Sequence, residues 1–264
     1  MDLGVASRAY IITGASAGIG KATAQILVEE GASALLCARG EDRLRGVVDA
    51  LGGAERSVHG LAIDASDPAS GERIRDAALE VFGRIDGVVT AAGMSTGEHL
   101  RDFSDESWMQ AYQVNTLSAI RLAMACVPVM RERGWGRIVT VGSTAGRTAD
   151  PRFASYGAAK AALMNATRAI SRAYSKYGVL ANCVLPGLTK SESVLAGYES
   201  AAQHMGVTAD DVEKRMMQLE TISMGRTGTP DEVARMIVFL ASDASSWTTG
   251  VNIQVDGGTL RDLP

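Results

Sequence analysis

Residues 9–20 read Ala-Tyr-Ile-Ile-Thr-Gly-Ala-Ser-Ala-Gly-Ile-Gly, a short apolar run that leads directly into a glycine-rich turn and then into a helical pattern. Glycines allow a sharp turn and a close approach of the backbone, and the start of a helix offers free N–H groups to a pyrophosphate. The spacing is G-x-x-x-G-x-G and differs from the G-x-G-x-x-G of the general dinucleotide fingerprint. The stretch predicts a phosphate-binding turn, with a plain structural loop as the alternative, and its candidate cofactor-binding residues are Gly14, Ser16, Gly18, Ile19 and Gly20.

Short aliphatic runs alternate with longer helical patterns along the chain. Several runs are apolar on both faces, as the strands of a parallel sheet covered by helices are. This order predicts right-handed crossovers and an α/β fold: a Rossmann-like doubly wound parallel sheet of about seven strands with helices on both faces. The expected strands are Ala9–Thr13, Ala34–Ala38, Val58–Ile63, Gly87–Thr90, Arg137–Val141, Val179–Val184 and Val251–Val255. The expected helices are Ile19–Glu30, Asp42–Leu51, Pro68–Phe82, Asp105–Arg133, Ala154–Lys176 and Pro230–Ala241.

No internal repeat, low-complexity tract or Pro/Ser-rich linker divides the chain, so we expect residues 1–264 to form a single dinucleotide-binding and catalytic domain. The segment at about 191–224 breaks the alternation, because it is polar, rich in Met and helical in pattern. It follows the C-terminal end of a strand, where open α/β sheets bind ligands. We therefore favour a mobile cover over a ligand cleft, with a surface excursion as the alternative.

The composition argues against several classes of protein. At 264 residues, with 46% hydrophobic and 21% charged residues, the chain is ordinary for a globular enzyme. The net charge of −4 argues against nucleic-acid and membrane-surface partners. Three scattered cysteines indicate buried, reduced thiols, and three isolated histidines argue against a metal site. No run approaches the roughly 18 uncharged apolar residues of a membrane span, and the N-terminus does not resemble a signal peptide, so we expect a cytoplasmic protein.

The end of the second expected strand bears on the choice of cofactor. A dinucleotide fold meets the adenosine ribose there, where an acidic residue binds the 2′-hydroxyl of NAD and an Arg suits the 2′-phosphate of NADP. This chain has Ala38 at the acidic position and Arg39 next to it. The pattern favours NADP over NAD, with Ser16 as a second candidate ligand of the phosphate. The alternative is a surface Arg at a strand end.

The middle of the chain holds a candidate acid/base pair. Residues 156–160 read Tyr-Gly-Ala-Ala-Lys, which places Tyr156 and Lys160 one helical turn apart, about 6 Å along the axis. A neighbouring cation favours the phenolate and lowers the pKa of the phenol. Ser143, thirteen residues before Tyr156, could hold the substrate oxygen that exchanges the proton. The alternative is a packed ring beside a solvated charge.

Together these motifs resemble the short-chain dehydrogenase/reductase family over nearly the whole chain. The stretch from Arg226 to Asp243 looks like the 3-oxoacyl-carrier-protein-reductase-like branch. The residues that carry the family resemblance are Thr13 to Gly20, Asp64, Ala91-Ala92-Gly93, Asn115, Ser143, Tyr156, Lys160, Pro186-Gly187 and Val255-Asp256-Gly257-Gly258.

The resemblance implies the catalytic set. Tyr156 would be the general acid/base of a ketone reduction, and Ser143 would polarise the carbonyl group. Lys160 would lower the pKa of Tyr156 and bind the nicotinamide ribose. Asn115 would anchor a water in the proton relay; an Asn that bonds to the backbone at a helix irregularity is the competing and compatible interpretation.

The resemblance also implies further cofactor contacts. Asp64 and Ala65 would meet the adenine, although an Asp that caps a turn is an equal alternative. The turn of Pro186, Gly187 and Thr189 would meet the nicotinamide carboxamide, or would simply end its strand. The Asn-Asn-Ala-Gly turn of the family appears here as Thr90-Ala91-Ala92-Gly93, so cofactor contacts at Ala91, Ala92 and Gly93 must come from the backbone or from Thr90. Ser191 stands where the family more often has Thr.

The expected function is an NADP(H)-dependent oxidoreductase that interconverts a ketone and a secondary alcohol. The alternatives are an NAD-dependent alcohol dehydrogenase of the same family and a non-catalytic dinucleotide sensor or scaffold. The expected partners are a small carbonyl or alcohol substrate and further copies of the chain in a homotetramer or homodimer; small residues between Ala158 and Ala166 are compatible with helix packing between subunits. Expected lining residues of the substrate pocket are Ser95, Arg147, Asp150 and Arg152, along with the Met-rich segment 191–224, which suits an apolar substrate.

Overall fold

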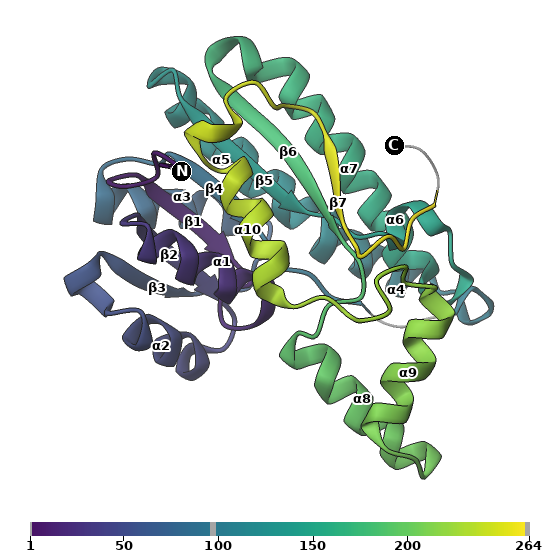
Figure 1. The fold of residues 1–264 in the computed structure, drawn as a ribbon. Helices are drawn as coiled ribbons and strands as arrows, with labels where there is room; N and C mark the ends of the chain where they lie inside the picture. The colour runs from purple at the N-terminus through teal and green to yellow at the C-terminus, as the bar shows by residue number, and fades with distance from the viewer. Residues whose placement is uncertain (1, 96–98, 262–264) are drawn as a thin grey trace.

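A computed structural model describes residues 2–95 and 99–261 (Figure 1). Seven parallel strands form one sheet in the order β3-β2-β1-β4-β5-β6-β7. The predicted fold class and all seven predicted strands are confirmed, with ends displaced by at most two residues. The strands are β1 Ala9–Thr13, β2 Ser33–Ala38, β3 Val58–Ala62, β4 Gly87–Thr90, β5 Gly136–Val141, β6 Val179–Pro186 and β7 Asn252–Val255.

Helices cover both faces of the sheet. One layer holds α1 Gly18–Glu29, α2 Glu41–Ala50 and α10 Pro230–Leu240, and the other holds α3 Ser70–Phe82, α5 Ser118–Glu132 and α7 Ala154–Tyr174. The remaining α-helices are α4 Asp105–Tyr112, α6 Ala145–Thr148, α8 Glu192–Met205 and α9 Ala209–Glu220. Short 3₁₀ turns are Gly53–Arg56, Leu100–Asp102, Pro151–Phe153, Ser175–Tyr177 and Asp243–Ser245.

The central strands β1, β2, β4, β5 and β6 are buried on both sides because each contributes side chains to two hydrophobic clusters, whereas the edge strands β3 and β7 are only partly buried. In β1, Tyr10 and Ile12 pack with the α1, α2 and α10 layer, whereas Ile11 between them packs with the α3, α5 and α7 layer. The side chains of a strand alternate between its faces, so a run of apolar residues fills both layers at once. This is the physical basis of the continuous apolar strands in the sequence.

The helix that we expected over 105–133 is interrupted. It consists of α4, a π-helical turn at Gln113–Leu117, and α5. By length and composition the run Asp105–Glu132 could cross a membrane, but half of its most apolar window is buried in the protein. Its apolar side chains are accounted for by packing, because α5 lies against α3 and α7. The π-helical turn at this interruption contains Asn115.

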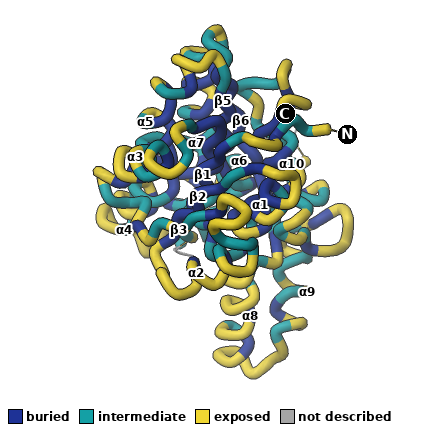
Figure 2. Tube along the Cα trace, turned by 90° about the vertical axis from the view of Figure 1, so that its left-hand side faces the viewer, coloured by how far each residue is buried: buried dark blue, intermediate teal, exposed yellow. Residues whose placement is uncertain are grey.

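Residues 191–224 form a helical arm made of α8 and α9 that projects from the body of the molecule (Figures 1 and 2). The arm has a small apolar cluster of its own around Tyr198, Ala202 and Val212. Its base is fastened: Lys190 N donates to Gly228 O at 2.9 Å, and Lys190 pairs with Glu213 at 2.8 Å. The role of the arm as a cover stays a prediction.

At Gly87 in β4 the sheet has no room for a side chain. A Cβ atom on Gly87 of β4 would lie 2.2 Å from the Tyr10 ring, which is fully buried. We expect Gly87→Ala to lower the free energy of unfolding by about 2 kcal/mol or more, because a packed core yields poorly to an added methyl group. Urea denaturation followed by circular dichroism measures the change.

Gly46→Ala is the matched control, because a Cβ atom at this exposed position of α2 meets nothing within 4 Å. Alanine favours a helix over glycine, so this variant is expected to gain about 0.5–1 kcal/mol. Equal stabilities of the two variants would contradict the packing argument.

Candidate active site

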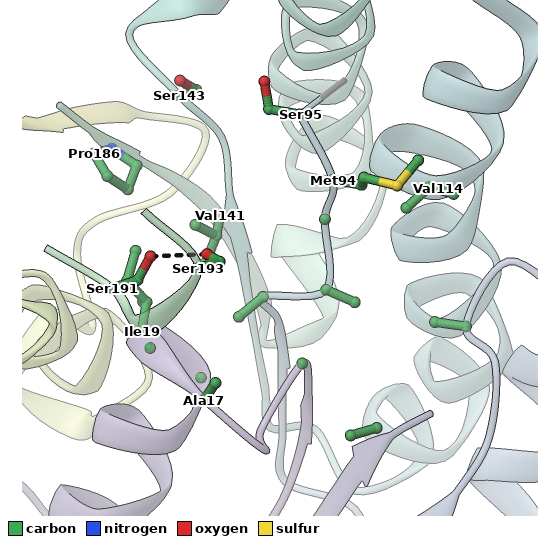
Figure 3. A pocket seen from close by; sticks show the side chains of 18 of the residues that line it. Ala17, Ile19, Met94, Ser95, Val114, Val141, Ser143, Pro186, Ser191 and Ser193 are labelled. Carbon is green, nitrogen blue, oxygen red and sulfur yellow. Dashed lines mark hydrogen bonds between the residues drawn. The ribbon is translucent and has the colours of Figure 1, made fainter. Parts of the chain in front are cut away.

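A cleft of about 450 Å³ opens at the carboxyl ends of the strands, where β1 and β4 lie side by side and the chain changes its direction of growth across the sheet. The cleft gathers every cofactor-binding residue that the sequence predicted and three of the four catalytic ones; Asn115 is not among its lining residues and is buried. Figure 3 shows Ser143, Ser95 and Pro186 around it, with Ala17 and Ile19 of the glycine turn. The lining residues from the prediction are Gly14, Ser16, Gly18, Ile19, Gly20, Arg39, Asp64, Ala65, Ala91, Ala92, Gly93, Ser143, Tyr156, Lys160, Pro186, Gly187 and Thr189.

The turn after β1 contains two glycines, Gly14 and Gly20, at positions where a side chain would clash with the backbone. Gly14 has φ +67°, and a Cβ atom there would lie 2.8 Å from the backbone of Ala91. A Cβ atom on Gly20 would lie 2.4 Å from the carbonyl oxygen of Gly14. The turn is therefore folded tightly on itself and pressed against the loop that follows β4.

The start of α1 presents unused hydrogen-bond donors to the cleft. Lys21 N donates to Ala17 O, but among the described residues no acceptor is found for the N–H groups of Ile19 and Gly20. The Gly18 N–H donates to the Glu192 carboxylate at 2.7 Å. A helix N-terminus with free N–H groups is an anion-binding site.

Arg39 and Asp64 mark the opposite end of the cleft. Arg39 is exposed beyond the end of β2 and makes no ion pair within the described part of the chain. Asp64 accepts hydrogen bonds from Ser66 N at 2.9 Å and Ser66 Oγ at 2.7 Å. These bonds hold the pKa of Asp64 below its usual value, and the charge of Arg39 lowers it further. Asp64 thus fastens a turn and also lines the cleft.

Close helix packing positions Ser143 beside Tyr156. Ser143 follows β5, Tyr156 lies near the start of α7, and the Ser143 hydroxyl is close enough to the phenol to lower its pKa. The short helix α6 between them crosses α7 at two glycines: a Cβ atom on Gly157 would lie 2.7 Å from Ala145 O, and one on Gly146 would lie 3.0 Å from Ala161 N. The sequence gives no signal for this crossing beyond the two glycines.

Lys160 is buried beneath the cleft with 3% of its surface exposed. Its Nζ donates to the backbone carbonyl of Val141 at 2.7 Å and lies 5.7 Å from the centroid of the Tyr156 ring. Gly93 leaves room for it, since a Cβ atom there would lie 3.3 Å from Nζ. Burial lowers the pKa of Lys160 to about 8, against a smaller raising influence of Cys183.

Tyr156 departs from the sequence expectation in its acidity. Burial raises the pKa of the phenol above its ordinary value, and the nearby Ser143 hydroxyl lowers it by less. The lowering by Lys160 that we expected is not seen in this structure, because the ammonium is directed to the Val141 carbonyl and burial dominates. The phenol is therefore protonated at neutral pH.

Asn115 lies in the π-helical turn and is committed to the backbone. Its Oδ1 accepts from Met94 N at 3.0 Å, and its Nδ2 donates to Met94 O at 2.9 Å and Ala111 O at 3.0 Å. The competing interpretation, an Asn that bonds to the backbone at a helix irregularity, is thus realised. These bonds fix the loop after β4, including Gly93, over Lys160.

The two Asn side chains that this loop lacks are partly replaced by a hydrogen bond from another strand, which we did not predict from the sequence. Ala92 N donates to Thr13 Oγ1 at 3.2 Å, so a hydroxyl from β1 fastens the loop after β4. Thr90 does not do so: among the described residues its buried hydroxyl has no partner. Ala91, Ala92 and Gly93 offer only backbone groups and small side chains to the cleft.

The expected substrate residues divide between two places. Ser95 lines the cleft, as do Ser191, Ser193 and Val194 of the predicted segment 191–224. Met94 and Val114 also line it and were not predicted. Asp150 and Arg152 instead line a second hollow with Glu220 of α9. Arg152 pairs with Asp150 and, at 3.3 Å, with Glu220, so this cation is already neutralised. Arg147 is not a lining residue of either hollow.

Comparisons with known proteins agree with this geometry. The family model described as Enoyl-(Acyl carrier protein) reductase matches residues 14–259. The chain is 34% identical to the uncharacterized oxidoreductase YvrD of Bacillus subtilis over all of both chains. It is 33% identical to the 3-oxoacyl-[acyl-carrier-protein] reductase FabG of Salmonella typhimurium over 94% of this chain and 95% of that one. The crystal structure of L-sorbose reductase from Gluconobacter frateurii, complexed with NADPH and L-sorbose, superimposes with a TM-score of 0.94 at 29% identity over all of both chains.

The lowered pKa of Lys160 makes a prediction about stability. Below about pH 8 the folded protein buries a charged ammonium, whereas the unfolded chain keeps a pKa near 10.5 and binds more protons between these values. Stability therefore rises with pH across this window, by about 2 kcal/mol between pH 7 and pH 10. Urea unfolding of wild type and Lys160→Met at both pH values isolates the contribution. An equal pH dependence of the two proteins would show that the ammonium is not buried.

Proposed function

The chain belongs to the short-chain dehydrogenase/reductase family, in its 3-oxoacyl-carrier-protein-reductase-like branch, and from this we propose that it is an NADP(H)-dependent oxidoreductase that interconverts a ketone and a secondary alcohol. The observation that carries the proposal is the convergence of Ser143, Tyr156 and Lys160 at the cleft that also holds the phosphate-binding turn. Acid/base groups and an anion site at one switch point are what hydride transfer to a carbonyl requires.

The cleft fits a dinucleotide. Gly14 and Gly20 form a cradle that a Cβ atom would fill, and α1 directs N–H groups into it. These groups would hold the pyrophosphate. At the other end, Arg39 and Ser16 would hold the 2′-phosphate, while Ala38 leaves no carboxylate to bind a bare ribose. NADPH is the cofactor named for the superimposed L-sorbose reductase.

The residues around the adenine and the nicotinamide would complete the cofactor site. Asp64 and Ala65 would meet the adenine, and the backbone of Ala91, Ala92 and Gly93 would line the middle of the site. Pro186, Gly187 and Thr189 would meet the nicotinamide end, where Thr189 Oγ1 already donates to Gly187 O at 3.0 Å. The bound nicotinamide supplies the hydride.

The catalytic residues supply the proton and its control. Tyr156 is protonated at neutral pH because its pKa is raised, which is the state that a general acid needs to protonate a carbonyl oxygen. Ser143, whose hydroxyl lies beside the Tyr156 phenol, would hold the same oxygen. Lys160 keeps a positive charge below about pH 8 beneath them and would bind the ribose hydroxyls. Asn115 would hold the loop after β4 over Lys160. It would also anchor a water molecule that takes part in the proton relay.

The proposed substrate is a small ketone or secondary alcohol. Near Ser143, the cleft is lined by the apolar side chains of Met94 and Val114 and by the hydroxyl of Ser95 (Figure 3). The arm, whose first turn contributes Ser191 and Ser193, would cover the bound substrate.

The proposed assembly is a homotetramer. Within the part of the chain that the structure describes, no strand pairs with the outer side of the edge strand β7, and nearby Trp247 is 99% exposed. An exposed edge beside a large apolar side chain is typical of a surface that pairs with another copy.

Replacement of Tyr156 by Phe tests the proposed chemistry. We expect Tyr156→Phe to lower kcat for ketone reduction by about 10²–10⁴-fold, since the general acid is removed. The dissociation constant of NADPH, measured by fluorescence titration, is expected to change little. Tyr177→Phe is the control, because this ring packs against Arg131 on α5, away from the cleft. Unimpaired turnover in Tyr156→Phe would refute the proposal; tight NADPH binding by wild type without turnover on a broad ketone panel would favour a sensor.

Replacement of Arg39 tests the choice of cofactor. Arg39→Ala is expected to weaken NADPH binding about tenfold by removing a charge-assisted contact, and to leave NADH binding unchanged. Arg43→Ala on exposed α2 removes the same charge nearby but outside the cleft. An equal loss for NADPH and NADH in Arg39→Ala, or tighter binding of NADH by wild type, would favour the NAD-dependent alternative.

A further inference from the structure

The arm touches the phosphate-binding turn through one carboxylate. Glu192, the first residue of α8, accepts a hydrogen bond at Oε2 from the backbone N–H of Gly18 at 2.7 Å. The surrounding packing is close, because a Cβ atom on Gly18 would lie 3.1 Å from the Cβ atom of Ser191. Figure 3 shows Ser191 and Ser193, joined by a hydrogen bond, beside Ile19 of the turn.

This carboxylate supplies a cap that α1 lacks in its own sequence. The residue before α1 is Ala17, no side chain of its own segment caps the helix, and the first turn contains no acidic residue. The N-terminus of a helix favours a negative charge through its free N–H groups and its dipole. Glu192 therefore occupies part of the anion site that α1 presents.

A phosphate group is an anion of the same kind for the same donors. Gly18 has a single N–H, and a carboxylate and a phosphate that approach it together also repel each other. We propose that Glu192 is an internal anion that competes with the cofactor pyrophosphate for the start of α1, so that it lowers cofactor affinity and leaves the turn when the cofactor binds. This inference rests on the proposed dinucleotide site.

The fastening of the arm allows this exchange. The base of the arm is held at Lys190, which precedes Glu192 in the chain. Lys190 N donates to the backbone of Gly228, and its side chain pairs with Glu213. The Glu192 side chain is exposed, so it can rotate away without disturbing packing. When the carboxylate leaves, Ser191 and Ser193 remain as uncharged polar groups on the cleft wall.

The test compares Glu192→Gln with wild type in NADPH binding by isothermal titration calorimetry. Gln has the same length and no charge, so we expect the dissociation constant of NADPH to fall about three- to fivefold, the size of a helix-terminus charge effect. Glu192→Ala, which removes the charge and the hydrogen bond, is expected to change in the same direction. Glu199→Gln, an exposed position on the same helix, is expected to leave the dissociation constant unchanged.

A fragment of the cofactor shows whether Glu192 competes with the pyrophosphate or with another part of NADPH. Adenosine 2′-monophosphate has the 2′-phosphate but no pyrophosphate, and its affinity is expected to be the same for wild type and Glu192→Gln. Unchanged or weaker NADPH binding by Glu192→Gln, or equal gains for NADPH and the fragment, would overturn the inference while leaving the dinucleotide site intact. Failure of wild type to bind NADPH would instead refute the proposed function.

Discussion

The cleft depends on the approach of two backbone segments at the switch point of the sheet. β1 pairs with β2 on one side and with β4 on the other, so the loops that follow β1 and β4 leave the sheet side by side. The absent side chain of Gly14 lets them touch, since an added Cβ atom would lie 2.8 Å from the Ala91 backbone. The bond from Ala92 N to Thr13 Oγ1 then holds the contact. Any side chain at Gly14 would separate the phosphate turn from the loop that covers Lys160.

The electrostatics of the site follow from burial more than from pairing. Burial lowers the pKa of Lys160 and raises that of Tyr156, and both shifts favour the neutral forms. Spacing along a helix brings the two side chains to one face, but it does not decide what their ends contact. Lys160 Nζ donates to the Val141 carbonyl and lies 5.7 Å from the centroid of the Tyr156 ring, and Lys160 does not lower the pKa of the phenol in this structure. This arrangement gives a proton donor at neutral pH, which is the state that carbonyl reduction needs.

The sequence predicted most of the fold and the lining of the cleft for identifiable reasons. The central strands are buried and apolar on both faces, so they were visible as continuous apolar runs, whereas the edge strands β3 and β7 are only partly buried and have shorter apolar signals. Glycine turns and strand ends are local features, so the residues that line the cleft could be located along the chain. The helix was predicted unbroken over 105–133 because the residues of the π-helical turn continue a helical pattern, and an irregularity at Asn115 was only the competing interpretation of that residue. The pairing of Arg152 with Glu220 and the bond from Gly18 to Glu192 were missed, because they join segments 68 and 174 residues apart.

The arm formed by α8 and α9 buries little apolar surface, and this determines how firmly it is held. Its cluster has three buried residues, Tyr198, Ala202 and Val212, whereas the layers that cover the sheet each bury many more. Several large apolar side chains of the arm remain exposed, including Leu195, Met205 and Leu219. A segment with so little buried apolar surface draws its position from its attachments, and these lie at its base and at the Gly18 bond. Release of the Gly18 bond therefore leaves the sheet and its two layers unchanged, and the arm stays attached at its base through Lys190.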